Sequence, residues 1–132
     1  MLRNLDRSQA DLLAAMNAVG DLAQLPQDWD SYGSRQIQTS AIRQALEILQ
    51  MANLQHIPMP FVVPVPGGGV QLEWRLEGRE LELEVQPDRT IAYLRVDEND
   101  IDEEGVVPKD QPSAILEHIQ WVAAQTTTEA PF

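Results

Sequence analysis

The stretch GGGVQLEWRLEGRELELEV, residues 67 to 85, decides the fold of this chain. On both sides of Glu77-Gly78, apolar residues alternate with polar ones, a pattern typical of strands with one buried face. A two-residue turn at Glu77-Gly78 would join these strands into a hairpin. In that register every buried residue meets an apolar partner, as in the pairs Trp74 with Leu81, Leu72 with Leu83, and Val70 with Val85. The stretch therefore predicts an antiparallel sheet.

The glycines at 67 to 69 raise the question of a nucleotide-binding loop. Such a loop leads into a helix N-terminus, whose amides bind the phosphate, and the Walker pattern places a lysine after the last glycine. Here the glycines lead into a strand, and the next lysine is Lys109. We interpret them as a turn between a proline-containing edge strand, Phe61 to Val65, and the hairpin.

Helical spacing of apolar residues marks three further segments. They run from about Ser8 to Ala23, from Thr39 to about Asn53, and from Pro112 onward. Helices that cover the apolar face of an antiparallel sheet make an α+β fold. The sequence thus predicts an antiparallel meander of three to four strands, with the helices packed on one face.

The length and charge of the chain narrow its organisation and its partners. With 132 residues we expect a single domain over 1–132, frayed at 1–7 and 126–132. The net charge of −12 disfavours nucleic acid and anionic membranes, and it favours basic protein surfaces or cations. No signal peptide or membrane-length apolar run is recognisable, so we expect a cytoplasmic protein.

Candidate partner-binding residues gather on the exposed face of the predicted sheet. After the hairpin, a four-residue loop from Pro87 to Thr90 would pair Leu83 with Leu94 and Glu82 with Arg95, burying Ala92, Leu94 and Val96. The exposed face would then carry Glu73, Glu82, Glu84, Tyr93 and Arg95. Glu73 would lie directly opposite Glu82, a like-charge pair that destabilises a sheet. The two main interpretations are a solvated face and a docking face for a basic partner. A third, a carboxylate-pair active site, needs a pocket that separates the two pKa values, and an open sheet face offers none.

A second candidate surface is the linker DWDSYG, residues 28 to 33. Its residues Trp29 and Tyr32 either cover the helix ends or belong to a binding surface. Gly33 is expected in a turn conformation, and the aspartates are expected to accept hydrogen bonds from local amides.

The sequence offers no arrangement of residues that predicts catalysis, a metal or a cofactor. It contains no cysteine, which excludes disulfides, thiolate catalysis and cysteine-based zinc sites. His56 and His118 lack metal-spaced companions, and we expect His118 on the surface, off the apolar stripe of its helix. The acidic run from Asp97 to Glu104 is typical of a solvated loop, and the alternative is a segment that binds cations nonspecifically or makes an electrostatic contact. We therefore predict no catalytic residues, no metal and no cofactor.

Two short motifs resemble those of a loosely defined group of small uncharacterised bacterial proteins. The group shares a W-D-x-Y-G linker, here Trp29 to Gly33, followed by a G-G-x-x-x-E-W strand, here Gly68 to Trp74. The similarity covers roughly residues 25 to 97. It carries no activity with it, and it implies a bacterial accessory protein.

Acidity, small size and the missing catalytic pattern favour a non-enzymatic protein-binding module. We expect an antitoxin-like or immunity-like protein, or an accessory subunit of a bacterial complex, that holds a basic protein partner. One alternative is an acidic mimic that blocks a nucleic-acid-binding protein. Another is a hydrolase that uses clustered carboxylates, which would need a pocket that separates their pKa values.

Overall fold

The computed structural model describes residues 7–124, which form three helices and one five-stranded sheet. The helices are α1 (Arg7–Leu22), α2 (Thr39–Leu54) and α3 (Pro112–Ala123). The strands are β1 (Phe61–Val65), β2 (Gly69–Leu76), β3 (Arg79–Val85), β4 (Ile91–Val96) and β5 (Asp102–Val107). Of the ends expected to fray, residues 1–6 and 126–132 lie outside the described part, and Arg7 begins α1.

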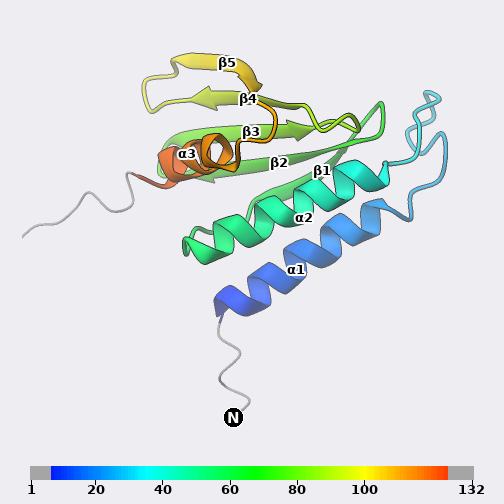
Figure 1. Ribbon diagram of the computed structural model, residues 1–132, viewed down its shortest axis with the longest axis horizontal. Helices are drawn as coiled ribbons and strands as arrows, with labels where there is room; N and C mark the ends of the chain where they lie inside the picture. The colour runs from blue at the N-terminus through cyan, green and yellow to red at the C-terminus, as the bar shows by residue number, and fades with distance from the viewer. Residues whose placement is uncertain (1–6, 125–132) are drawn as a thin grey trace, which may run out of the picture.

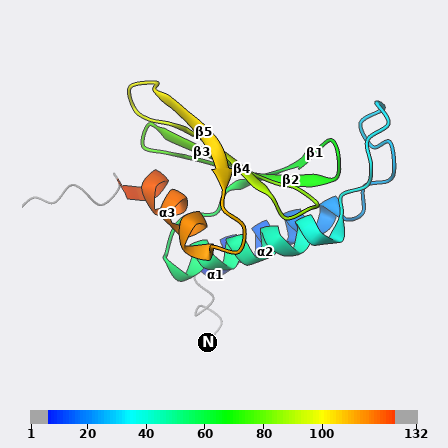
Figure 2. The same cartoon turned by 45° about the horizontal axis from the view of Figure 1, so that its top comes forward.

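The sheet is a meander in which each strand pairs antiparallel with the next strand along the chain. All three helices lie on the same side of it (Figures 1 and 2). Helices α1 and α2 pack against each other and against β1 and β2, while α3 packs against β3, β2 and α2. The α+β class with an antiparallel sheet is confirmed, but the sheet has five strands where three to four were expected. None of the described helices is long and apolar enough to cross a membrane.

The hairpin of β2 and β3 forms in the predicted register. Trp74 pairs with Leu81, and both side chains are buried beneath the helices. The indole N–H of Trp74 donates to the carbonyl oxygen of Pro58 at 2.8 Å. Glu77 and Gly78 have φ values of 49° and 90°, as a two-residue hairpin turn requires. Alternation and turn chemistry therefore specify the same register.

The glycines between β1 and β2 form the predicted turn. Gly67 and Gly68 both have a φ of 98°, in the region that favours glycine. Gly69 begins β2 under a different constraint, because a Cβ there would lie 2.5 Å from the carbonyl oxygen of Val85. The strand β3 thus leaves no room for a side chain at this position.

The loop between β3 and β4 is one residue shorter than expected. Gln86 donates its N–H to the carbonyl of Thr90 at 2.9 Å, which leaves only Pro87 to Arg89 in the loop. Arg89 has a φ of 74°, the left-handed conformation that commonly ends a three-residue hairpin loop. Val85 therefore pairs with Ile91, and the expected register of β4 is wrong by one residue.

This shift places every side chain of β4 on the face opposite to the expected one, because side chains alternate along a strand. Tyr93 and Arg95, predicted on the exposed face, lie on the face that carries the helices. Ala92, Leu94 and Val96, predicted in the core, lie on the other face. The candidate surface predicted from the sequence was therefore wrong to include Tyr93 and Arg95. It also lacked Ala92, Leu94 and Val96, which lie on that face.

The acidic run also forms more regular structure than expected. Asp97 begins a turn, and its side chain accepts hydrogen bonds from the amides of Asn99 and Ile101. The chain then continues as β5 from Asp102, rather than as a solvated loop. Gly105 lies opposite Tyr93, whose ring would be 2.9 Å from a Cβ at that position.

Candidate functional site

The face of the sheet turned away from the helices, called here the open face, is the main candidate surface. Figure 2 shows the sheet with all described helices below it. Strand alternation places four carboxylates near its centre, and they belong to Glu73, Glu80, Glu82 and Glu84. Apolar side chains flank this centre, and they belong to Phe61, Val63 and Val65 of β1 and to Ala92, Leu94 and Val96 of β4.

The carboxylates of the open face repel one another. Glu73 lies directly opposite Glu82, as the sequence predicted. Partial burial raises the pKa of Glu82, and the neighbouring charges of Glu73 and Glu80 raise it further. Arg75 is the one basic residue that the described strands place on this face, and its nitrogens come no nearer than 3.9 Å to Glu73 and Glu80. Additional positive charge would therefore stabilise this face.

Two amide side chains hold the carboxylates in place. Gln71 donates its Nε2–H to Glu73 at 2.6 Å. Gln86 donates in the same way to Glu84. These bonds satisfy one carboxylate oxygen each without supplying charge, so the negative potential of the surface is retained.

A shallow hollow of about 180 Å³ opens between β2, β3, β4 and β5 on the open face. Its lining combines acidic residues with the aliphatic surface of Ala92 and Leu94, and it includes Gln71, Glu82, Glu84 and Glu104. Such a lining can accept hydrogen bonds from an ammonium or guanidinium group while the apolar atoms contact its aliphatic stem. No group of three or more histidine, aspartate or glutamate residues within 7–124 is arranged to hold a metal ion.

The predicted partner-binding residues fall into three places. Glu73, Glu82 and Glu84 share the open face. Tyr93 and Arg95 project from the opposite face, under α3. The linker residues lie between α1 and α2, at one end of the helical layer in both ribbon views.

In the linker, Trp29 and Tyr32 have different surroundings. Trp29 packs partly against the core and donates its indole N–H to the carbonyl of Arg35 at 3.1 Å. Tyr32 is 91% exposed, so it does not cover a helix end. Gly33 has the expected turn conformation, and Asp28 and Asp30 accept hydrogen bonds from local amides. A binding role for this linker stays a prediction.

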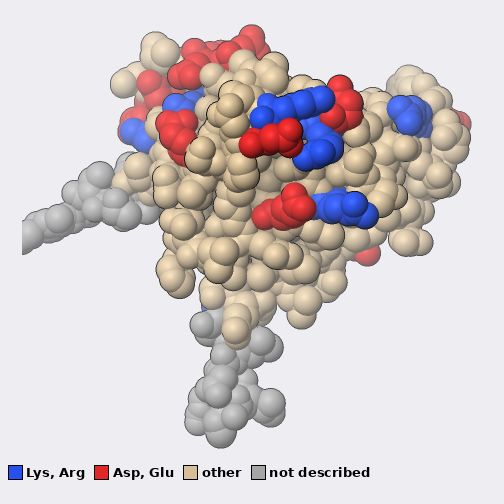
Figure 3. All heavy atoms as spheres, viewed as in Figure 1, with Lys and Arg blue, Asp and Glu red and all other residues tan. Residues whose placement is uncertain are grey.

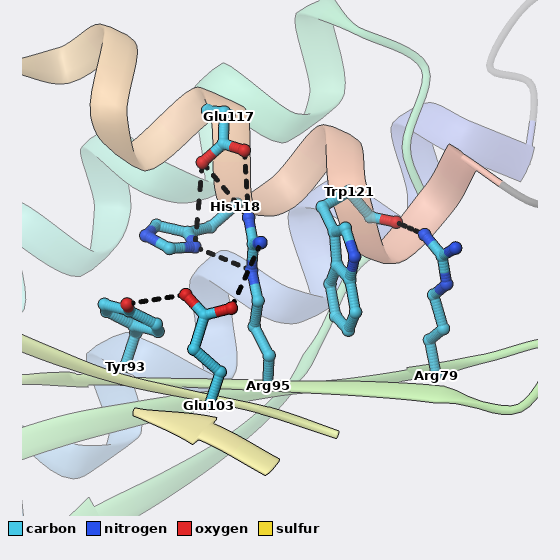
Figure 4. A network of polar contacts seen from close by, with 7 residues as sticks. All are labelled: Arg79, Tyr93, Arg95, Glu103, Glu117, His118 and Trp121. Atoms are coloured by element: carbon cyan, nitrogen blue, oxygen red, sulfur yellow. Dashed lines mark hydrogen bonds and ion pairs between the residues drawn. The ribbon is translucent and has the colours of Figure 1, made fainter. Parts of the chain in front are cut away.

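Beneath α3, sequence reasoning missed a polar network, called here the α3 anchor (Figure 4). Its residues are Arg79, Tyr93, Arg95, Glu103, Glu117, His118 and Trp121. Arg95 lies at its centre, with a side chain only 12% exposed. Its Nε–H donates to Nδ1 of His118 at 3.0 Å, and its Nη2 donates to both carboxylate oxygens of Glu117. The guanidinium carbon also lies 4.6 Å from the centroid of the Trp121 ring.

The other members extend this network across the sheet. Tyr93 stacks on His118 with ring centroids 4.1 Å apart and donates its hydroxyl proton to Glu103 at 2.9 Å. This hydrogen bond, together with burial, raises the pKa of Tyr93. Arg79 donates to the backbone carbonyl of Trp121 at 2.7 Å and to Glu98 at 3.0 Å. The network thus ties α3 to β3, β4 and β5.

Protonation of His118 is opposed by its position. Burial and the charge of Arg95 lower the pKa of His118. Its Nδ1 accepts a hydrogen bond from Arg95, so the neutral ring that carries its proton on Nε2 fits the site. His118 was expected on the surface, but it is buried. The signal was present in the sequence, because Ile115, His118, Ile119 and Val122 follow the spacing of one helix face. The α3 anchor therefore stabilises the fold, and the open face remains the candidate binding surface.

Comparisons with protein-family models, with curated proteins and with solved structures find no match to this chain.

Proposed function

We propose that this chain is a non-enzymatic binding module whose open face docks a basic protein. The role would be that of an antitoxin-like or immunity-like protein, or of an accessory subunit of a bacterial complex. The observation that carries the proposal is the set of four carboxylates at the centre of a sheet face that no described helix covers, with Arg75 as the one basic residue that the described strands place there. Docking of lysine or arginine side chains would replace carboxylate repulsion with attraction.

The apolar flanks of the open face support the same proposal. Apolar side chains that are exposed in the free protein favour association when a partner covers them, and charged groups beside them select that partner. Because Tyr93 and Arg95 face the helices, Ala92, Leu94 and Val96 take their place beside the carboxylates. The open face is thus both more acidic and more apolar than the sequence suggested, which suits a basic, amphipathic partner surface.

An acidic mimic of nucleic acid is the special case in which the basic partner normally binds DNA or RNA. The hydrolase has weaker support, because its carboxylates would lie on a strand surface rather than in an enclosed pocket that separates their pKa values. Competition between this chain and nucleic acid for the captured partner distinguishes the mimic from the other docking roles.

The test is a binding measurement on the partner captured from the native host, with Glu82→Lys as the informative variant. Lysine at 82 would face Glu73 and turn a repulsive pair into an attractive one, so the fold should be retained. Binding should weaken by about tenfold or more, mainly through a slower association rate at low salt. The control is Asp21→Lys, which changes the net charge equally at an exposed position on α1.

Two results would contradict the proposal. Equal weakening by Glu82→Lys and Asp21→Lys would show that net charge alone attracts the partner. Wild-type binding by Glu82→Lys would remove the open face as the contact surface.

A further inference from the structure

The outer edge of β5 has the geometry of a site for strand addition. In both ribbon views β5 is the last strand of the sheet, and no described element lies beyond it (Figures 1 and 2). It is six residues long, and its first three residues are exposed. An edge strand of this kind presents unpaired N–H and C=O groups that can pair with another chain.

The hydrogen bonds of the β4–β5 hairpin identify which backbone groups point outward. Asp97 donates its N–H to the carbonyl of Ile101 at 3.1 Å, and the N–H of Ile101 donates to the Asp97 side chain, so these two residues occupy a hydrogen-bonded position at the end of the hairpin. Hydrogen-bonded pairs alternate with non-bonded pairs along an antiparallel ladder. The next residue, Asp102, is therefore in a non-bonded pair, and the same holds for Glu104 and Val106. The N–H and C=O groups of these three residues point away from β4, along the free edge.

The two edges of the sheet differ in how well they are protected. Proline in an edge strand removes a donor and discourages strand addition, and β1 contains Pro64 and follows Pro60. Strand β5 contains no proline. Its protection is the negative charge of Asp102, Glu103 and Glu104, which repels another acidic strand, including a second copy of this chain, but attracts a basic one.

The side chains along β5 specify the kind of strand that would fit. Asp102, Glu104 and Val106 project on the open face, and Val106 is 62% exposed. Figure 3 shows acidic side chains gathered at the end of the molecule where β5 lies. A strand placed beside β5 would set its own alternate side chains next to these residues. Lysine or arginine at every second position would therefore meet Asp102 and Glu104 and extend the contact across the open face.

We propose that the basic partner adds an extended segment, with lysine or arginine at every second position, as a sixth strand on the free edge of β5. This inference rests on the proposed function, because it takes the partner to be basic. Backbone hydrogen bonds at 102, 104 and 106 would supply affinity, and the carboxylates would select the side chains.

The first test uses a synthetic peptide of about ten residues that alternates lysine and threonine, a length typical of a strand. Exchange of the outward amides of Asp102, Glu104 and Val106 should slow by about tenfold or more at saturation, while other exposed amides are unaffected. The control peptide has the same sequence with N-methyl groups on alternate residues, which keeps the charge and removes the backbone donors. It should bind about tenfold more weakly. Equal binding of both peptides would show that only charge is recognised, and it would overturn strand addition.

The second test compares Glu104→Pro with Glu104→Gln in binding the captured partner. Both variants remove the same charge, but only proline removes the outward N–H, and pairing with β4 is kept because that N–H does not bond to β4. Glu104→Pro should bind about tenfold more weakly than Glu104→Gln. Should the proline variant fail to fold, the N-methylated peptide decides alone.

These results separate the two proposals. Weak binding by Glu82→Lys, with equal binding by the two Glu104 variants, would leave open-face docking in place and refute strand addition. Full binding by all three variants would refute both.

Discussion

Replacing Arg95 with methionine should destabilise the fold, although the sequence analysis placed this charged side chain on the exposed face of the sheet. Methionine keeps an aliphatic stem but removes the guanidinium. His118 would lose the donor to its Nδ1 in a buried position, and an unpaired buried polar atom costs about 1–3 kcal/mol. The stacking of the guanidinium on Trp121 adds about 0.5–1 kcal/mol. Glu117 is 65% exposed, so its ion pair adds at most about 1 kcal/mol.

The expected loss in the free energy of unfolding is about 3 kcal/mol, measured by urea denaturation. The matched control is Glu117→Gln, which removes the exposed partner and should cost less than about 1 kcal/mol. Amide exchange should show the loss first in α3, because the network ties this helix to the sheet. A loss below about 1 kcal/mol for Arg95→Met, or equal losses for the two variants, would refute the role given to the α3 anchor.

Two further predictions concern the core and its dependence on pH. The pKa of His118 is lowered in the folded protein below the value of 6.5 expected in the unfolded chain. Below about pH 6.5 the unfolded chain therefore takes up a proton before the folded protein does, and the free energy of unfolding should decrease as the pH falls. Urea denaturation between about pH 7.5 and about pH 5.5 should show this decline, and His118→Asn should flatten it; an unchanged slope in the variant would assign the decline to other groups. Trp74→Ala should lower the free energy of unfolding by about 3–5 kcal/mol, because Trp74 is 1% exposed and its indole donates a hydrogen bond to the carbonyl of Pro58. A loss below about 1 kcal/mol would contradict its place in the core.

The sequence predicts β2 and β3 correctly because every determinant of that hairpin is local. Alternation identifies the buried face, and Glu77-Gly78 sets the turn. In β4 the same reasoning fails, because the more uniformly apolar set, Ala92, Leu94 and Val96, lies on the open face. The number of residues in the loop between β3 and β4 decides which alternate residues of β4 face the core. Alternation within β4 does not reveal that number, because either set of alternate residues could be buried.

The missed α3 anchor has a different cause. Arg95 can be buried because α3 presents a carboxylate, an imidazole nitrogen and an indole ring to it. These partners are distant in sequence, because β5 lies between β4 and α3. Charged residues are rarely buried without such partners, so a sequence pattern assigns them to water. Strand β5 was missed because acidic residues and Gly105 give it no alternation.

The two faces of β4 explain why stability and the proposed binding can be separated in this protein. On one face, Tyr93 and Arg95 satisfy their polar atoms against α3 and β5, so changes there act on the fold. On the other face, Leu94 lies beside Glu82 in contact with solvent. Its apolar surface would contribute to stability only when a partner removes it from water. Repulsion among the carboxylates acts in the same direction, since it too is relieved by a basic partner. The open face is therefore tolerated in the free protein and would be favourable in a complex with a basic partner, which is the physical basis for proposing that this side of the sheet binds.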